Sequence, residues 1–207
     1  MKKLALVTML CIAGLGLGAC SINGSTSNNP SQETKVSDVP AAHQDIRLAF
    51  NNIKLGNRDN DFSGGSTLED LKNLFGEPAQ TFQTPAGDVT LDGYTWQFDT
   101  VTVTVNLLRD SAITRAISNF NFIRFNTISK QAIAQIADGM TFQQAIDLLG
   151  QPDVYSESVS SDNTRTQALW VSGIEGASNQ TQTQAQAQIS LEFTDDRLTH
   201  KTLTNID

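Results

Sequence analysis

The pentapeptide Leu-[Phe/Leu]-Gly-x-Pro appears twice in this chain, as LFGEP at 74–78 and as LLGQP at 148–152. Residues around it repeat with the same spacing of 74 positions: Thr67 with Thr141, Gly76 with Gly150, Pro78 with Pro152 and Trp96 with Trp170. An ordered series of matches at constant spacing indicates a tandem duplication. The chain is therefore predicted to fold as two similar units, at 41–120 and 121–207.

Helix signals open each unit. Apolar residues recur at helical spacing through 41–56, and Ser66 followed three positions later by Glu69 predicts a capping box for a second helix. Thr141 and Gln144 give the same pattern in the second unit. The glycine of each pentapeptide is predicted to end its helix, and the proline prevents the helix from resuming. The repeated motif is thus interpreted as structural.

Strand signals follow each pentapeptide. In two consecutive runs, apolar residues alternate with other residues: Tyr94, Trp96 and Phe98 in the first, and Val101, Val103 and Val105 in the second. The second unit shows the same alternation over 188–194. Each unit is predicted to be a helix-loop-helix followed by about four antiparallel strands, so the fold class is α+β with two tandem units. The repeat-equivalent Trp96 and Trp170 are predicted to anchor the two cores.

The first 20 residues have the features of a bacterial export signal. Lys2 and Lys3 precede a 16-residue apolar run, 4–19, which is shorter than the roughly 20 residues that span a bilayer. The run ends in Leu-Gly-Ala-Cys, which resembles the lipobox of bacterial lipoproteins. This resemblance implies a signal peptide at 1–19 and lipidation of Cys20, which would hold the mature chain at the extracytoplasmic face of the cell membrane. The alternative is an ordinary secreted protein cut near Ala19.

The amino-acid composition limits what the rest of the mature chain can form and bind. Residues 20–40 are rich in Ser, Asn and Thr and contain few large apolar side chains, so they are interpreted as a flexible tether. The chain carries 22 acidic and 14 basic residues, and such an acidic protein is a poor partner for nucleic acid. Both cysteines, Cys11 and Cys20, lie in the export region, so no disulfide is expected in the folded part.

The order of helix-loop-helix, Gly-x-Pro and four-stranded meander, written twice over roughly 42–206, resembles the β-lactamase inhibitor protein (BLIP) architecture. It is more similar still to BLIP-like small bacterial lipoproteins whose domain has no assigned function, and more distantly to the SmpA/OmlA type of outer-membrane assembly lipoprotein. The stretch GGSTLEDLKNLFGEP with a later Tyr-x-Trp carries the resemblance. It implies a BLIP-like fold and, through it, binding of an extracytoplasmic protein.

The sequence contains no nucleophile elbow, zinc-protease motif or phosphate-binding loop. Its two histidines, His43 and His200, have no metal-ligand spacing and are interpreted as exposed surface residues. The chain is therefore expected not to be an enzyme and to use no cofactor. One metal hypothesis stays open, because Asp59, Asp61, Ser63, Gly64 and Asp70 match positions of a calcium loop. A polar loop joining two helices is the favoured interpretation of that stretch.

The polar face of the predicted strands is the strongest candidate for a binding surface. It contains Thr95, Gln97, Thr102 and Thr104 in the first unit and Gln188, Ser190, Glu192 and Thr194 in the second. If the two sheets meet edge to edge, these residues form one broad surface. The alternative is a merely solvated face, because threonine is common on exposed strands.

The second unit also contains an insertion, 173–187, in which glutamine alternates with threonine or alanine. It is predicted either to extend a hairpin toward a partner or to form a mobile tip. The residues together favour a lipid-anchored, non-catalytic module that binds an extracytoplasmic protein in the manner of an inhibitor. The alternatives are an envelope structural or assembly lipoprotein and a small-ligand or calcium-binding lipoprotein.

Overall fold

The computed structural model describes residues 41–124, 127–175 and 187–206. The predicted signal peptide, Cys20, the tether and most of the 173–187 insertion lie outside the described residues. The elements follow in the order α1 (Gln44–Phe50), η1 (Arg58–Asn60), α2 (Leu68–Phe75), β1 (Gln80–Ala86), β2 (Val89–Phe98), β3 (Val101–Leu108), β4 (Ser111–Ser118), α3 (Lys130–Ala134), α4 (Phe142–Leu149), β5 (Val154–Val159), β6 (Thr164–Trp170), β7 (Gln188–Thr194) and β8 (Arg197–Thr204). None of the described helices is long and apolar enough to cross a membrane.

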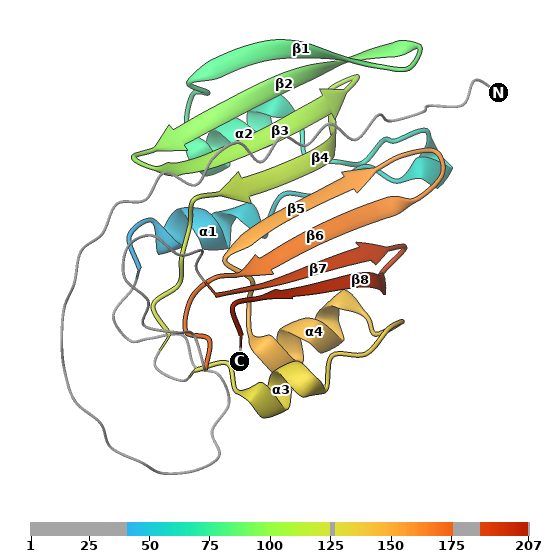
Figure 1. Ribbon diagram of the computed structural model, residues 1–207. Coiled ribbons are helices and arrows are strands. Elements are labelled where there is room, and N and C mark those ends of the chain that lie inside the picture. The colour runs from blue at the N-terminus through green and yellow to red at the C-terminus, as the bar shows by residue number, and fades with distance from the viewer. Residues whose placement is uncertain (1–40, 125–126, 176–186, 207) are drawn as a thin grey trace.

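The eight strands form one antiparallel sheet in which they lie in chain order, from β1 at one edge to β8 at the other (Figure 1). At the middle of the sheet, β4 pairs with β5 from Thr114–Ser158 to Ile117–Tyr155. The two groups of strands predicted from the sequence therefore meet edge to edge in a single sheet. Because side chains alternate along each strand, this continuity gives the molecule two faces that run the full width of the sheet.

Both helix pairs pack on the same, apolar face of the sheet. Leu71 of α2 and Leu149 of α4 belong to one core cluster with buried side chains of β2 to β8. In Figure 1, α2 lies behind the upper strands, α1 lies at the level of β4 and β5, and α3 and α4 lie beside the lower edge. Trp96 is 1% exposed and Trp170 is 0% exposed, so the prediction that both anchor the core is confirmed.

Each tryptophan also fixes the end of a helix. Trp96 Nε1 donates to the carbonyl oxygen of Gly76 at 2.8 Å, and Trp170 Nε1 donates to that of Gly150 at 2.9 Å. The two glycines have φ values of 80° and 75° with ψ values of −161° and −176°. This region of backbone conformation is open essentially to glycine alone. The pentapeptide therefore needs its glycine to turn the chain from helix to strand beneath the indole ring.

The longer helices, α2 and α4, begin with capping boxes. In α4, Thr141 and Gln144 form the predicted box, with Gln144 Oε1 accepting from the Thr141 backbone nitrogen at 2.8 Å. In α2 the box consists of Thr67 and Asp70, so the prediction of Ser66 and Glu69 is wrong by one position. The reason is that Ser66 is buried and its Oγ accepts from the Lys54 backbone nitrogen at 3.0 Å.

Candidate functional site

The eight side chains predicted to form a binding surface lie on one face of the sheet, opposite the helices. Thr95 pairs with Thr104, and Gln97 pairs with Thr102, across β2 and β3. On β7, Gln188, Ser190, Glu192 and Thr194 alternate with the buried residues of that strand. Buried and partly exposed positions alternate along β3 and β7, so these side chains point away from the core.

The register joins these side chains into one surface, which we call the polar face. One row of cross-strand partners runs from β1 to β8 through Gln80, Thr95, Thr104, Ala116, Ser156, Gln167, Glu192 and His200. A parallel row runs through Phe82, Gly93, Asn106, Thr114, Ser158, Arg165, Thr194 and Arg197. The polar face therefore consists of these two rows and the eight predicted side chains, and it spans all eight strands.

The two halves of the polar face differ in charge. The rows on β1 to β4 contain only uncharged residues, whereas the rows on β5 to β8 contain Arg165, Glu192 and Arg197. The uncharged half also carries an aromatic ring, Phe82, which is 40% exposed. A Cβ atom on Gly93 would lie 2.3 Å from Phe82 Cε2, so the ring packs directly over the glycine. The glycine thus gives Phe82 a fixed position at the edge of the polar face.

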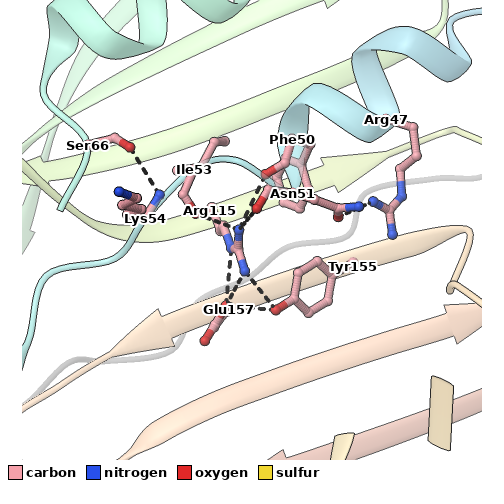
Figure 2. A network of polar contacts seen from close by, with 9 residues as sticks. All are labelled: Arg47, Phe50, Asn51, Ile53, Lys54, Ser66, Arg115, Tyr155 and Glu157. Carbon is pink, nitrogen blue, oxygen red and sulfur yellow. Dashed lines mark hydrogen bonds and ion pairs between the residues drawn. The ribbon is translucent and has the colours of Figure 1, made fainter. Parts of the chain in front are cut away.

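On the opposite face, a network of charged side chains crosses the junction between β4 and β5 (Figure 2). Arg115 Nη2 donates to Glu157 Oε2 at 2.7 Å and to Tyr155 Oη at 3.1 Å. Tyr155 Oη donates to the same carboxylate oxygen at 2.7 Å, and Arg115 Nη1 donates to the Ile53 carbonyl oxygen at 2.6 Å. The Arg115 and Glu157 side chains are 14% and 21% exposed, so the ion pair that joins the two halves is largely shielded from water.

Burial and charge shift the proton affinities in this network. Burial by itself would lower the pKa of Arg115, but the oxygens of Tyr155 and Glu157 offset it and leave that pKa raised. Burial, reinforced by the Glu157 charge, raises the pKa of Tyr155 although Arg115 opposes the shift. Both shifts keep the protons on Arg115 and Tyr155, where each donates a hydrogen bond to the carboxylate.

Arg47 of α1 is fully buried beside this network. Its Nη1 donates to Asn51 Oδ1 at 2.6 Å, and its Nη2 donates to the Pro152 carbonyl oxygen at 2.9 Å. The guanidinium also lies 5.8 Å and 5.6 Å from the ring centroids of Phe50 and Phe122. Burial lowers the pKa of Arg47 to about 10. Aromatic faces and neutral oxygens therefore hold this charge between the two halves.

A second buried charge fixes the segment that connects the halves. Asp153 is 0% exposed and accepts hydrogen bonds from the backbone nitrogens of Phe122, Val171 and Ser172 at 2.7, 2.8 and 3.1 Å. It also pairs with Arg124 Nη2 at 3.2 Å. Asp153 thus ties the connecting segment to the strands of the second half, which is a structural role.

A polar hollow of about 450 Å³ opens beside Arg115 and Glu157. The segment 53–59 forms one wall, and Val159 and Thr164 line the other. Arg58, in the same wall, pairs with Asp195 at 3.1 Å. Since Arg58, Arg115 and Glu157 are all engaged within the protein, these groups are not free to hold a charged ligand.

The histidines do not come together. His43 Nε2 lies 2.7 Å from Asp99 Oδ2 and its side chain is 28% exposed, so His43 is a partly exposed surface residue that is paired with a carboxylate. His200 is exposed on β8, as predicted. Across the parts of the chain that the structure describes, no group of three or more His, Cys, Asp or Glu side chains is placed to hold a metal ion.

The loop that resembles a calcium site is held together by protein groups. Arg109 Nη1 donates to Asp61 Oδ2 at 2.6 Å, while Asp70 serves in the cap of α2. Ser111 Oγ donates to the Phe62 carbonyl oxygen at 2.6 Å. The Phe62 ring packs on a small second core made of Ala86, Leu91, Leu108 and Ile113. The loop therefore closes an apolar cluster, and the side chains of three of its five candidate ligands, Asp61, Ser63 and Asp70, already have other partners.

The network of charged side chains at the β4–β5 junction was not predicted from the sequence. Arg115 and Tyr155 are 40 residues apart, and Arg47 and Pro152 are 105 apart, so no local pattern reveals their contacts. Comparison of the two repeats gives one indication that these charges are special. Glu157 aligns with Gln83 at the offset of 74 positions, and Arg115 aligns with Lys201 at the offset of 86. The ion pair thus occurs only where the two halves meet.

Comparisons with known proteins agree with this architecture. The model of a domain family of unknown function, DUF3862, matches residues 42–206. The crystal structure of a candidate β-lactamase inhibitor protein from Streptococcus mutans is 37% identical, with a TM-score of 0.73 over 81% of this chain and 99% of that chain. No curated protein matches the sequence.

Proposed function

The chain belongs to the DUF3862 family, and on that premise we propose that it is a lipid-anchored extracytoplasmic protein that binds a protein partner without catalysing a reaction. The polar face is the observation that carries this proposal. It extends across all eight strands, while both helix pairs pack on the other face. A surface of this breadth suits a protein partner, because specific protein interfaces bury about 800 Å² on each side.

The solved structure that is similar to this chain supports a protein as the kind of partner. The Streptococcus mutans protein is described as a candidate inhibitor of β-lactamase, and an inhibitor acts by covering part of an enzyme. For this chain we propose an inhibitor-like role toward an extracytoplasmic protein. The residues of the polar face would make the contact, assisted by the 173–187 insertion.

The finer architecture is also part of the proposal: two tandem units, each a helix pair followed by four strands. Equivalent hydrogen bonds support it. The backbone nitrogens of Leu68 and Phe142, at the starts of α2 and α4, donate to Asp110 and Asp196 at 3.0 Å and 2.9 Å. The backbone nitrogens of Ala79 and Asp153 donate to the carbonyl oxygens of Thr95 and Leu169 at 2.8 Å and 2.9 Å. Such matching contacts are expected of a duplicated unit.

Membrane anchoring rests on the sequence. The lipobox-like Leu-Gly-Ala-Cys motif supports lipidation of Cys20, and the tether 20–40 would let the folded part reach a partner beyond the membrane surface. Metabolic labelling with a radioactive fatty acid tests this part alone: label should enter the wild-type chain and be absent from Cys20→Ala.

Capture of the partner tests the main proposal. The full chain, tagged at its C-terminus, would be exposed to the secreted and envelope proteins of its host, with a Thr104→Arg variant beside it. Thr104 lies at the centre of the uncharged half of the polar face, and Thr127→Arg, in an exposed loop, is the matched control. One protein captured by the wild type and the control, but lost with Thr104→Arg, supports the proposal. Equal capture by all three chains contradicts it, and recovery of membrane-assembly machinery would favour an assembly lipoprotein.

A further inference from the structure

The junction between β4 and β5 shows how one half of the sheet accepts a strand from the other. Four residue pairs form it: Thr114 with Ser158, Arg115 with Glu157, Ala116 with Ser156 and Ile117 with Tyr155. β4 is the last strand of the first half, and β5 is the first strand of the second. A first strand and a last strand also form the outer edges of the sheet, since β1 and β8 each pair on one side only among the described residues.

The last strand β8 repeats the surroundings of β4. Arg115 on β4 donates to the carbonyl oxygen of Ile53, beyond α1, and Lys201 on β8 donates to that of Ile136, beyond α3, at 2.9 Å. Equivalent backbone bonds also hold the starts of the two strands: Ala112 to Ser66 at 3.0 Å, and Leu198 to Met140 at 2.9 Å. The outer edge of β8 is therefore built like the edge of β4 that receives β5.

We propose that β8 of one molecule pairs antiparallel with β1 of a second copy of this chain, so that the β4–β5 junction recurs between molecules. This inference rests on the two-unit architecture proposed above and is independent of what the polar face binds. Transferring the internal register by the repeat offsets of 86 and 74 positions gives the intermolecular pairs His200–Thr84, Lys201–Gln83, Thr202–Phe82 and Leu203–Thr81.

The exposed apolar side chains fall in this register. Among the described residues, four large apolar side chains are exposed, and two of them, Phe82 at 40% and Leu203 at 42%, belong to the four pairs. Ile117, the counterpart of Leu203 at the internal junction, is 1% exposed. An edge strand that carries exposed apolar side chains is open to strand addition. Head-to-tail pairing would shield both residues.

The charges allow this contact but make it weaker than the internal junction. The formal net charge of the chain is −8, so two copies repel each other in general. β1 carries no charged residue, however, and β8 carries Arg197 and Lys201 but no carboxylate. The edges are therefore the parts of the sheet where two copies meet without repulsion between carboxylates. Lys201 and Gln83 replace the Arg115–Glu157 ion pair, so the association should be reversible.

The two edges are different surfaces, so the contact does not close into a symmetric dimer. A head-to-tail contact of this kind extends into open chains unless its rotation closes a ring. Each added copy would continue the polar face. Anchoring to one membrane would promote such chains by raising the local concentration of copies.

Cysteine cross-linking of the full chain tests the register. The double variant Thr84→Cys/His200→Cys, oxidised in detergent solution, should give a ladder of species larger than a dimer on a non-reducing gel. Each single variant should give no such ladder, because its new cysteine faces no cysteine of the next copy. The mismatched pair Thr81→Cys/His200→Cys should give no ladder, because the two positions are about 10 Å apart along the strand, beyond the reach of a disulfide. No ladder with the matched pair, or equal ladders with both pairs, would overturn the proposal.

Sedimentation of the full chain over a range of concentrations tests the contact without cysteines. Gln83→Glu should strengthen self-association, because it places a carboxylate beside Lys201 of the next copy, and Gln83→Lys should weaken it. A change of about two- to fivefold in the association constant is expected for an exposed pair. Monomers at every concentration, or the same effect from both substitutions, would show that β1 and β8 do not meet. Thr104→Arg should leave self-association intact, so failure of partner capture is distinguishable from failure of this contact.

Discussion

Arg115 and Lys201 hold equivalent positions in the two halves of the sheet, but only Arg115 meets a carboxylate on a neighbouring strand. Each donates to a backbone carbonyl oxygen that follows the first helix of its half, at 2.6 Å and 2.9 Å. Arg115 also reaches Glu157 at 2.7 Å across the β4–β5 junction. The two halves of the molecule are thus joined by a charge pair that the outer edge lacks.

Removal of both partners of this pair should cost less unfolding free energy than the sum of the two single removals. Arg115→Met leaves a shielded carboxylate without its cation, and Glu157→Leu leaves a shielded guanidinium, so we expect each to cost about 3 kcal/mol of unfolding free energy. The double variant should cost less than the two single effects together, with a coupling of at least about 1 kcal/mol. Urea denaturation of the four proteins measures this. Strictly additive losses would show that the two charges do not interact. The exposed Lys72–Glu77 pair is the control and should show far weaker coupling.

Stability should fall at alkaline pH, and Tyr155 should account for part of the loss. Because burial and Glu157 raise its pKa, the folded chain keeps the Tyr155 proton above pH 10, where an unfolded tyrosine ionises. The stability that this residue contributes is complete below about pH 10 and is lost as pH rises further. Arg47 opposes the trend, because its pKa of about 10 relieves its burial cost in the same window.

Tyr155→Phe should therefore show a smaller decrease in unfolding free energy than the wild type between pH 8 and 11. Urea midpoints at these two pH values give the comparison. Tyr94→Phe is the matched control, because Tyr94 is only partly buried, although burial raises its pKa as well. An unchanged pH slope in Tyr155→Phe would mean that this hydroxyl is not shielded.

Loss of either buried tryptophan should destabilise the chain strongly and to a similar extent. Trp96→Ala and Trp170→Ala each remove a fully buried ring and should cost about 3–5 kcal/mol. Trp96→Phe keeps a ring but removes the hydrogen bond to Gly76, so its cost should be lower. Thermal and urea unfolding provide the measurement. A loss below about 1 kcal/mol for Trp96→Ala would be incompatible with its burial.

Calcium should not stabilise the folded chain. Asp61 is paired with Arg109, and Asp70 caps α2, so neither carboxylate is available to a cation without breaking a protein contact. The melting temperature should be the same in millimolar calcium chloride and in a chelator. Asp61→Asn should be equally insensitive to calcium. A calcium-dependent rise in the wild type that disappears in Asp61→Asn would restore the hypothesis of a calcium site.

The repeated motif made much of this fold predictable. Trp96, Gly76 and their equivalents in the second half mark residues whose contacts are local in each unit, and spacing alone located them. The cap at Ser66 was misplaced because a serine before a helix resembles a cap in sequence, whereas here it binds the backbone of Lys54. Whether Ser66 or Thr67 caps the helix depends on Lys54, which lies 12 residues earlier in the chain.

The sequence was sufficient to predict that the eight side chains share one face of the sheet, although it did not predict the network around Arg115 and Glu157. Thr104 and Glu192 could be placed because strand alternation assigns a face to every residue, and pairing of β4 with β5 joined the two sets. Arg47, Arg115 and Glu157 look like ordinary surface charges in the sequence. Their burial follows from how α1 packs over the junction between the halves, which alternation and helical spacing do not specify.

The position of the main core, beneath the helices on one side of the sheet, has an evolutionary consequence. Trp96 and Leu149 lie beneath the helices, while Thr95 and Thr104 lie on the other side of the same strands and support none of that packing. Substitutions at these two outer positions should therefore cost little stability, provided that the new side chain suits a strand. Members of such a lineage can exchange the residues that meet a partner while keeping the scaffold intact, so their targets can diverge faster than their architecture.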